Sequence, residues 1–400
     1  MKKILLSLSA SIFIGQISYA VASVSEAFSS GTTSGDFRLR VEAVDQNNAL
    51  KDASAMTLRS RIAYTTAGYQ GFSAKLEFED SRIVLGQGEY TVGPTGYKGG
   101  QYSVIGDPET TEIDQAFLKY KTDKVIAKIG RQVIALDGHR FIGHVGWRQD
   151  RQTFDGLRVV FSPAKKLKFT YGFIDQRNRI FAEAADVDSA DHLFNGSFRT
   201  GFGKLGAYAY LLENEDGVSN ALDTYGVSLK GSTKFDQTKI LYATELASQT
   251  SEVGTTEKDA IYLLLEAGTV VGGITTKLGY EMLGSDNGVY GFSTPLATGH
   301  KFNGWSDQFL GTPPQGLVDI YLSVGGKAAG GKWAAIYHDF SADESTATVD
   351  DLGTEINLLY ARKLGKHYNG GIKYAAYSAG DTAAGKVDTD KLWLWLGASF

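Results

Sequence analysis

The sequence predicts an all-β fold, a transmembrane antiparallel β-barrel of about eighteen strands with up-and-down topology. Three observations predict it: apolar and polar residues alternate with a period of two, short and long connections alternate, and the last strand ends in an aromatic residue. The 400 residues include 48 Gly, 6 Pro, 21 Tyr and 21 Phe, which fits a large, bent antiparallel sheet. The mean hydropathy of −0.17 agrees with a barrel, whose apolar residues occupy one face only.

The first residues have the pattern of a secretory signal peptide, so we divide the chain into a signal peptide at residues 1–22 and a barrel domain at residues 23–400. A basic start precedes an apolar run from Ile4 to Ile17, and Ala20-Val21-Ala22 is a small-x-small cleavage site. A retained membrane anchor is the alternative, but the run is shorter than the roughly 20 residues that a spanning helix needs. We therefore expect cleavage near Ala22.

Charge and cysteine content exclude several classes of protein. The chain has no cysteine, which excludes a disulfide framework, thiol chemistry and thiolate metal sites. Cleavage removes Lys2 and Lys3 and no acid, so the formal net charge changes from −5 to −7. A mildly acidic chain of this kind gives no indication of a nucleic-acid partner.

Strands are predicted wherever residues alternate between an apolar and a polar face. In the first strand, Arg38, Arg40 and Glu42 alternate with apolar residues. The mature chain shows no convincing amphipathic helix. The expected strands cover residues 37–43, 56–65, 72–79, 112–121, 124–131, 155–162, 166–175, 191–200, 204–213, 222–231, 237–247, 258–267, 270–282, 317–325, 331–340, 354–363, 369–378 and 389–400.

The connections alternate between short and long through the whole chain. The short joins include 67–70, 121–123, 163–165, 201–203 and 267–269. The long joins lie near residues 45–55, 82–111, 132–154, 176–190, 214–221, 248–257, 283–316, 341–353 and 379–388. A transmembrane barrel has tight turns on its periplasmic side and longer loops outside, whereas a soluble sandwich or solenoid has no reason to sort its loops. An even strand count places both termini in the periplasm.

Two segments test the barrel interpretation. Residues 260–283 form the most apolar stretch after the signal peptide. A single helix there would contain Glu266 near its middle and several glycines, so two strands with a turn at 267–269 are favoured. At the C-terminus, alternate residues from Leu392 to Phe400 share one face, which resembles the terminal strand signal of outer-membrane barrels. The alternative, an ordinary edge strand, leaves the final phenylalanine unexplained.

The strand phases predict which residues line the lumen, because eighteen strands leave an aqueous interior. Arg38 and Arg40 share a hairpin with Arg59 and Arg61, and four neighbouring arginines repel one another unless acids or an anionic solute intervene. We expect this ladder to contact anionic groups; a solvated, self-compensating lumen is the alternative. The pore-lining, anion-contacting candidates are Arg38, Arg40, Arg59, Arg61, Lys75, Lys128, Arg158, Lys168 and Arg199, and Lys119 has the same phase.

The loop at residues 132–154 is a candidate constriction. It lies in the densest polar cluster of the chain, at residues 131–155, and a long external loop with this many arginines is unusual for solvation alone. Folded inward, it would supply charged groups for selectivity; a mobile surface loop is the alternative. The constriction-loop candidates are Arg131, Asp137, Arg140, Arg148 and Arg151.

A metal or catalytic site is not expected. His139 and His144 are five residues apart with no third ligand nearby in sequence, which is a weak metal signal. A triad of Asp137, His139 and Ser162 lacks a nucleophile elbow or other supporting context. We therefore expect no catalytic residues, no metal, no cofactor and no enzyme activity.

Two stretches resemble the alginate-export-like family of outer-membrane porins. One runs from Gly130-Arg131-Gln132 through Trp147-Arg148-Gln149 to Phe154-Asp155-Gly156-Leu157-Arg158, and the other covers residues 300–319. The resemblance spans most of residues 35–400 and implies an eighteen-stranded barrel that moves an anionic polysaccharide or a related small solute. Alginate exporters carry a long periplasmic turn that plugs the pore, whereas the join at residues 364–368 is short here. Polymer export is therefore in doubt. The loop at 283–316, with Pro313-Pro314, is expected to pack on itself or to fold over the mouth.

The leading functional prediction is a porin-type channel in the outer membrane of a Gram-negative bacterium, passing small hydrophilic solutes, anionic ones among them. The alternatives are an exporter of an anionic, alginate-like polysaccharide, an outer-membrane enzyme such as a lipase, and an adhesin. The expected partners are membrane lipid and lipopolysaccharide, a small hydrophilic solute or anionic saccharide, and the barrel assembly machinery through the C-terminal strand. No nucleic acid is expected, and both a monomer and a homo-oligomer are compatible with the sequence.

Overall fold

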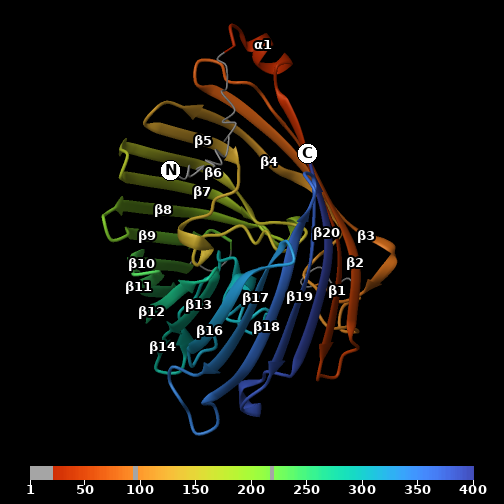
Figure 1. The fold of residues 1–400 in the computed structure, drawn as a ribbon, viewed down its shortest axis with the longest axis vertical. Helices are drawn as coiled ribbons and strands as arrows, with labels where there is room; N and C mark the ends of the chain where they lie inside the picture. The colour runs from red at the N-terminus through yellow and green to blue at the C-terminus, as the bar shows by residue number, and fades with distance from the viewer. Residues whose placement is uncertain (1–20, 93–97, 217–219) are drawn as a thin grey trace, which may run out of the picture.

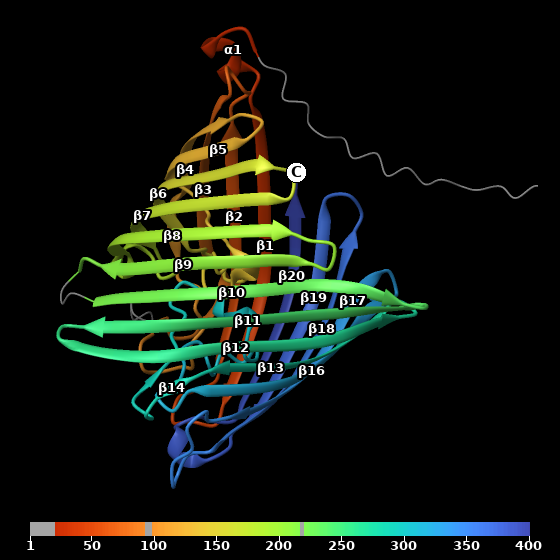
Figure 2. The ribbon, with the colours of Figure 1, turned by 90° about the vertical axis from the view of Figure 1, so that its left-hand side faces the viewer.

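A computed structural model describes residues 21–92, 98–216 and 220–400, and its main feature is a closed barrel of eighteen antiparallel strands (Figures 1 and 2). The barrel strands are β1 (Thr32–Gln46), β2 (Ala53–Thr65), β3 (Phe72–Glu89), β4 (Thr110–Lys121), β5 (Val125–Arg131), β6 (Thr153–Ala164), β7 (Leu167–Asn178), β8 (Val187–Arg199), β9 (Lys204–Asn214), β10 (Asn220–Phe235), β11 (Thr238–Val253), β12 (Thr256–Val271), β13 (Ile274–Leu283), β16 (Leu317–Ala328), β17 (Gly331–Ser341), β18 (Asp351–Leu364), β19 (Tyr368–Ser378) and β20 (Thr389–Ser399). Each predicted strand corresponds to one of them, so the fold prediction is confirmed.

A few short helical segments and a small two-stranded ribbon are not part of the barrel sheet. The helical segments are α1 (Val24–Ser29), η1 (Asp137–His139), η2 (Glu183–Ala185), η3 (Gly299–Lys301) and η4 (Thr382–Ala384), and β14 (Ser285–Asp286) pairs with β15 (Tyr290–Gly291). The predicted signal peptide at residues 1–22 falls almost entirely outside the described residues. Among the described helices, none has the length and apolar character needed to cross a membrane.

The barrel has an apolar outer face and a polar inner face. In β20, Leu392, Leu394 and Leu396 are 37–50% exposed on the outside, whereas Trp393 between them is fully buried inside. Successive residues of a strand point to opposite faces, so the same alternation is repeated around the wall. A closed sheet also pairs every strand, which satisfies the backbone polar groups inside hydrocarbon. This is the arrangement of a membrane-spanning barrel.

Two predicted connections are wrong in the structure. The join expected at 248–257 is a tight turn, because β11 continues to Val253 and β12 starts at Thr256. The turn expected at 267–269 lies instead at Gly272-Gly273, where both residues have positive φ, 57° and 83°. Glycine adopts such angles without strain, which suits a two-residue hairpin turn. Gly268 lies within β12, where a Cβ would be 2.6 Å from the Thr276 carbonyl oxygen of β13, so close strand packing requires a glycine there.

The first and last strands close the barrel. β1 pairs with β20 from Asp36 opposite Ser399 to Gln46 opposite Thr389. Beyond the strand, the Phe400 amide donates to the Gly35 carbonyl at 3.1 Å, and the Phe400 ring stacks on Phe37 with centroids 6.1 Å apart. The C-terminal segment is therefore the closing strand, and α1 lies at the same end of the barrel as the C-terminus (Figure 2).

The hydrophobic core lies inside the barrel because two long loops enter the lumen. The constriction loop (residues 132–152) joins β5 to β6, and the second inner loop (residues 284–316) joins β13 to β16. In Figure 1 the constriction loop, in yellow, runs between strands β6–β9 on the left and β20 on the right. Phe141 and Ile142 of the constriction loop pack with Phe292 and Leu296 of the second inner loop and with inward-facing Tyr262 of β12. The two loops thus form one packed body inside the barrel.

Candidate functional site

The constriction loop is held against the inner face of β1 by two of the predicted pore arginines. Arg38 donates to the carbonyl oxygens of Trp147 at 2.7 Å and of Arg148 at 2.5 Å, and to Gln149 Oε1 at 3.0 Å. Arg40 donates to the Trp147 carbonyl at 2.6 Å and forms an ion pair with Asp107. These arginines face the lumen as predicted, but their donors hold the chain's own backbone.

The other two arginines of the ladder are also paired within the chain. Arg59 pairs with Asp36, and Arg61 pairs with Glu79 of β3 and donates to the Gln149 carbonyl at 3.3 Å. Carboxylates and loop carbonyls thus accept from these guanidinium groups, which matches the self-compensating lumen given as the alternative, and contact of the ladder with an anionic solute stays a prediction. Sequence phase places the four side chains inside the barrel, but it does not reveal that a loop covers them.

Arg148 joins the constriction loop to the wall and to the second inner loop. Its Nη1 lies 3.0 Å from both carboxylate oxygens of Glu42 in β1, and its Nη2 lies 2.9 Å from Asp307 Oδ2. Asp307 also accepts from Lys391 of β20 at 3.0 Å and contacts His300 Nδ1 at 2.7 Å. Burial lowers the pKa of His300 to about 3, so the neutral ring donates to Asp307. The two loops are therefore locked together by buried charges.

Aromatic rings reinforce this junction around Lys373 of β19. Its Nζ lies 3.8 Å from the ring centroid of Trp305 and 4.4 Å from that of Trp147, and 2.6 Å from His300 Nε2. Trp147 stacks on His300 with centroids 5.0 Å apart. Each loop thus contributes one indole to a cation–π contact with a single wall lysine, which is a strong interaction once water is excluded.

The constriction loop crosses the lumen from β3 and β4 to β9 and β13. On one side, Arg151 donates to Asp114 of β4 at 3.0 Å and pairs with Glu77 of β3. On the other, Arg140 donates to Glu281 of β13 at 2.7 Å, and Asp137 pairs with Lys204 of β9 at 2.9 Å.

Arg131 is the exception among the predicted constriction residues. It belongs to β5 and holds Asp155 of β6 through two hydrogen bonds of 2.8 and 2.9 Å. It therefore braces the base of the loop and does not narrow the lumen.

A row of cations without acid partners lines the wall between the constriction loop and the short turns. Lys119 of β4 lies directly opposite Lys128 of β5, which lies directly opposite Arg158 of β6. Within the described residues, no carboxylate lies within 4.0 Å of these three cations. Arg158 Nε is buried with no hydrogen-bond partner, and Lys128 Nζ sits 4.0 Å from the Phe117 ring centroid. Neighbours on one face are about 5 Å apart, so this row concentrates positive charge.

The remaining predicted cations differ in their surroundings. Lys75 pairs with Glu77 at 2.7 Å, whereas Lys168 and Arg199 are exposed near the short turns. The structure therefore brings Lys128 and Arg158 together with Lys119. Lys75, Lys168 and Arg199 are separate charges near the short turns.

A cavity of about 430 Å³ lies between the constriction loop and the wall formed by β9–β13, β16 and β17. Its lining combines charges of both signs with aromatic faces. The lining residues that matter here are Arg140, Lys204, Glu266, Tyr262, Phe302 and Tyr321.

The residues considered for catalysis do not form a triad. Asp137 is engaged by Lys204 and Asn195, and His139 Nδ1 lies 3.3 Å from Thr298 Oγ1. Ser162 lies next to the short turn, where its amide donates to Lys124. His139 and His144 stand edge to face with centroids 5.0 Å apart, and burial, followed by the His139 charge, lowers the pKa of His144 to about 4.

Sequence reasoning missed several residues that organise the lumen. Asp107, Asp307 and Lys373 accept or donate across the barrel, yet only Asp307 lies in a stretch with a family resemblance. Trp305-Ser306-Asp307 mirrors Trp147-Arg148-Gln149 as an aromatic residue followed by polar ones. Nothing in the sequence alone indicates, however, that these two loops meet.

Comparison with known proteins agrees with this architecture. The model of the family described as "Alginate export" matches residues 30–286. No curated protein matches the chain. Among solved structures, OccK9 (OpdG) of Pseudomonas aeruginosa is 14% identical, with a TM-score of 0.72 over 94% of this chain and 99% of that chain. OpdK of the same organism, solved with vanillate, is 14% identical, with a TM-score of 0.72 over 92% and 98%. OccAB1 of Acinetobacter baumannii is 12% identical, with a TM-score of 0.71 over 96% and 99%.

Proposed function

Since the chain belongs to the alginate export family, we propose that it is an outer-membrane channel for small hydrophilic solutes and that it prefers anions. The observation that carries the proposal is the row formed by Lys119, Lys128 and Arg158. Each neighbouring pair in this row is directly opposed in the sheet. The arginines that hold the loops have partners within the chain, whereas these three cations are left to a solute or to counterions. A carboxylate passing the row gains charge-assisted hydrogen bonds that a neutral solute lacks.

The inner loops set the size of the solute. Arg148, Arg140 and Arg151 fix the constriction loop to three parts of the wall, and the cavity beside it measures about 430 Å³. A space of this size suits a single sugar or a small aromatic acid. Vanillate, the molecule present in the OpdK structure, is a small aromatic carboxylate and belongs to the same chemical class. We propose that solutes of this class are the natural cargo.

Export of an anionic polysaccharide is the second candidate, favoured by the family description. A uronate polymer would present a carboxylate on each residue to the same basic row. However, the periplasmic join between β18 and β19 has only residues 365–367, too few for a plug, and the packed inner loops obstruct a continuous polymer path. Competition experiments distinguish the two: a uronate oligomer that blocks and then crosses the channel would favour export, and one that only blocks it would favour the small-solute channel.

The selectivity proposal predicts the effect of removing the row. We expect the wild-type channel in a planar bilayer to prefer chloride over potassium, and Lys119→Gln/Lys128→Gln/Arg158→Gln to lower that permeability ratio by about two-fold or more. The matched control is Lys124→Gln/Lys165→Gln/Lys166→Gln, which removes three positive charges from exposed turns. A permeability ratio that is equal in the two triple variants would contradict the proposal.

A further inference from the structure

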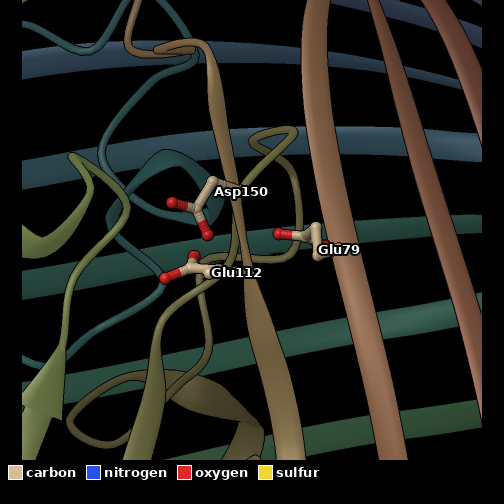
Figure 3. A group of neighbouring side chains, drawn as sticks. All are labelled: Glu79, Glu112 and Asp150. Carbon is tan, nitrogen blue, oxygen red and sulfur yellow. The ribbon is translucent and has the colours of Figure 1, made fainter.

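Three carboxylates gather where the constriction loop meets β3 and β4. Glu79 of β3, Glu112 of β4 and Asp150 of the loop each offer an oxygen within 4.8 Å of the other two, and their side chains point toward a common space (Figure 3). Asp150 is completely buried and Glu79 is 1% exposed. Like charges this close repel strongly in a place with little water, so the cluster requires a compensating cation or a shared proton.

Asp150 is the residue that demands an explanation. Both of its carboxylate oxygens are buried and have no hydrogen-bond partner within the described part of the chain. Buried polar groups without partners are rare in folded proteins, and a buried carboxylate is among the most costly of them.

The nearby cations pair with Glu79 and with acids outside the cluster, and they leave Asp150 and Glu112 without a partner. Arg61 forms its ion pair with Glu79, and the Arg151 guanidinium binds Glu77 and Asp114. The Arg151 contact with Glu79 runs through its backbone amide, at 3.3 Å from Oε1. No described arginine or lysine lies within 4.0 Å of an oxygen of Asp150 or Glu112. Asp150 and Glu112 therefore need either a shared proton or a cation from outside the chain.

We propose that Glu79, Glu112 and Asp150 form a divalent cation site, with Ca²⁺ as the best-fitting ion. Carboxylate oxygens are the preferred ligands of hard cations, and Ca²⁺ accepts six to eight oxygens in flexible geometry, whereas Mg²⁺ requires a near-ideal octahedron. Water completes the coordination shell beside the three side chains. Bound there, the ion ties the constriction loop to two wall strands, on the side of the barrel opposite Glu281. The proposal depends on the loop geometry and is independent of which solute passes.

Calcium binding to the refolded full-length protein tests the site, because protein refolded in detergent carries no lipopolysaccharide to bind the ion. After treatment with EDTA, equilibrium dialysis with ⁴⁵Ca²⁺ should give one tightly bound ion per chain in the wild type. Asp150→Asn should weaken that binding by about ten-fold or more, because it replaces a charged ligand by a neutral amide of the same shape. Glu183→Gln, which alters an exposed acid of another loop, should leave it unchanged.

A second variant and a folding check make the outcome decisive. Glu112→Gln should weaken Ca²⁺ binding as Asp150→Asn does, and both variants should keep the heat-dependent gel mobility of a folded barrel, since each removes a repulsive charge. The proposal is overturned if the wild type binds no Ca²⁺, which would mean that a shared proton satisfies the pair. It is equally overturned if Asp150→Asn binds Ca²⁺ as tightly as the wild type does.

Discussion

Replacing Arg148 with alanine is expected to release the constriction loop and to raise single-channel conductance by about two-fold or more, because breaking a buried ion pair from one side costs about 3–5 kcal/mol. The substitution leaves Glu42 and Asp307 without their shared guanidinium, although both acids are at most 6% exposed. A loss of this size changes the ratio of docked to released loop by at least about a hundred-fold. Conductance of the purified protein in planar bilayers measures the effect.

Arg82→Ala is the matched control for this experiment. Arg82 forms an ion pair with Asp80 in β3, and 49% of its side chain is exposed. Exposed ion pairs contribute little to stability. Arg148→Lys provides an intermediate, since it keeps the charge but loses the planar fork that reaches both acids. An Arg148→Ala channel with wild-type conductance would mean that the packed aromatic and apolar contacts alone hold the loop.

Removing the ring of Phe400 is expected to reduce barrel assembly in cells far more than it reduces barrel stability. The ring is 68% exposed on the lipid side, and its loss removes about 2–3 kcal/mol of burial in hydrocarbon. That is small for a barrel whose seam pairs Asp36 through Gln46 with β20. We propose that the assembly machinery reads this terminal residue. Phe400→Ala should therefore refold normally into detergent, while its folded amount in the outer membrane falls by about ten-fold.

Phe198→Ala is the appropriate comparison for the Phe400 variant. Phe198 is also a lipid-facing aromatic residue, 46% exposed, and it lies beside the short turn that follows β8. Its variant should assemble in cells nearly as well as the wild type does. Equal assembly of the two variants would show that Phe400 contributes only apolar surface. A failure of Phe400→Ala to refold in detergent would instead assign the effect to closure of the seam at Gly35.

The barrel could be predicted from the sequence because the patterns that define strands and turns are local. A strand period of two decides which face each residue takes, so Arg38 and Arg40 had to point inward once Leu39 pointed outward. Turn chemistry sets most joins, but it was misjudged at Gly268, where glycine serves close strand packing and not a turn. Local patterns could not show that β11 and β12 extend as a continuous ladder to Val253 and Thr256.

The arrangement of the lumen could not be predicted because its contacts are long-range. Arg148 meets acids that lie 106 and 159 positions away in sequence. The sequence indicated a polar loop that could fold inward, yet which acid each arginine would bind depends on the path of both inner loops. For the same reason, the sequence does not distinguish the row at Lys128, which has no acid partner among the described residues, from the ladder at Arg61, which pairs with carboxylates. Only the structure separates the cations that hold loops from those that have no acid partner among the described residues.

The most direct measurement of the central proposal compares glucuronate with glucose as solutes in liposomes that contain the wild-type protein. The two share a ring and a size, and differ in a carboxylate in place of a hydroxymethyl group. A channel with an available row of cations at Lys119, Lys128 and Arg158 should admit glucuronate faster, and added salt should reduce the difference by screening. Equal rates, or faster entry of glucose, would contradict the proposal of an anion-preferring channel.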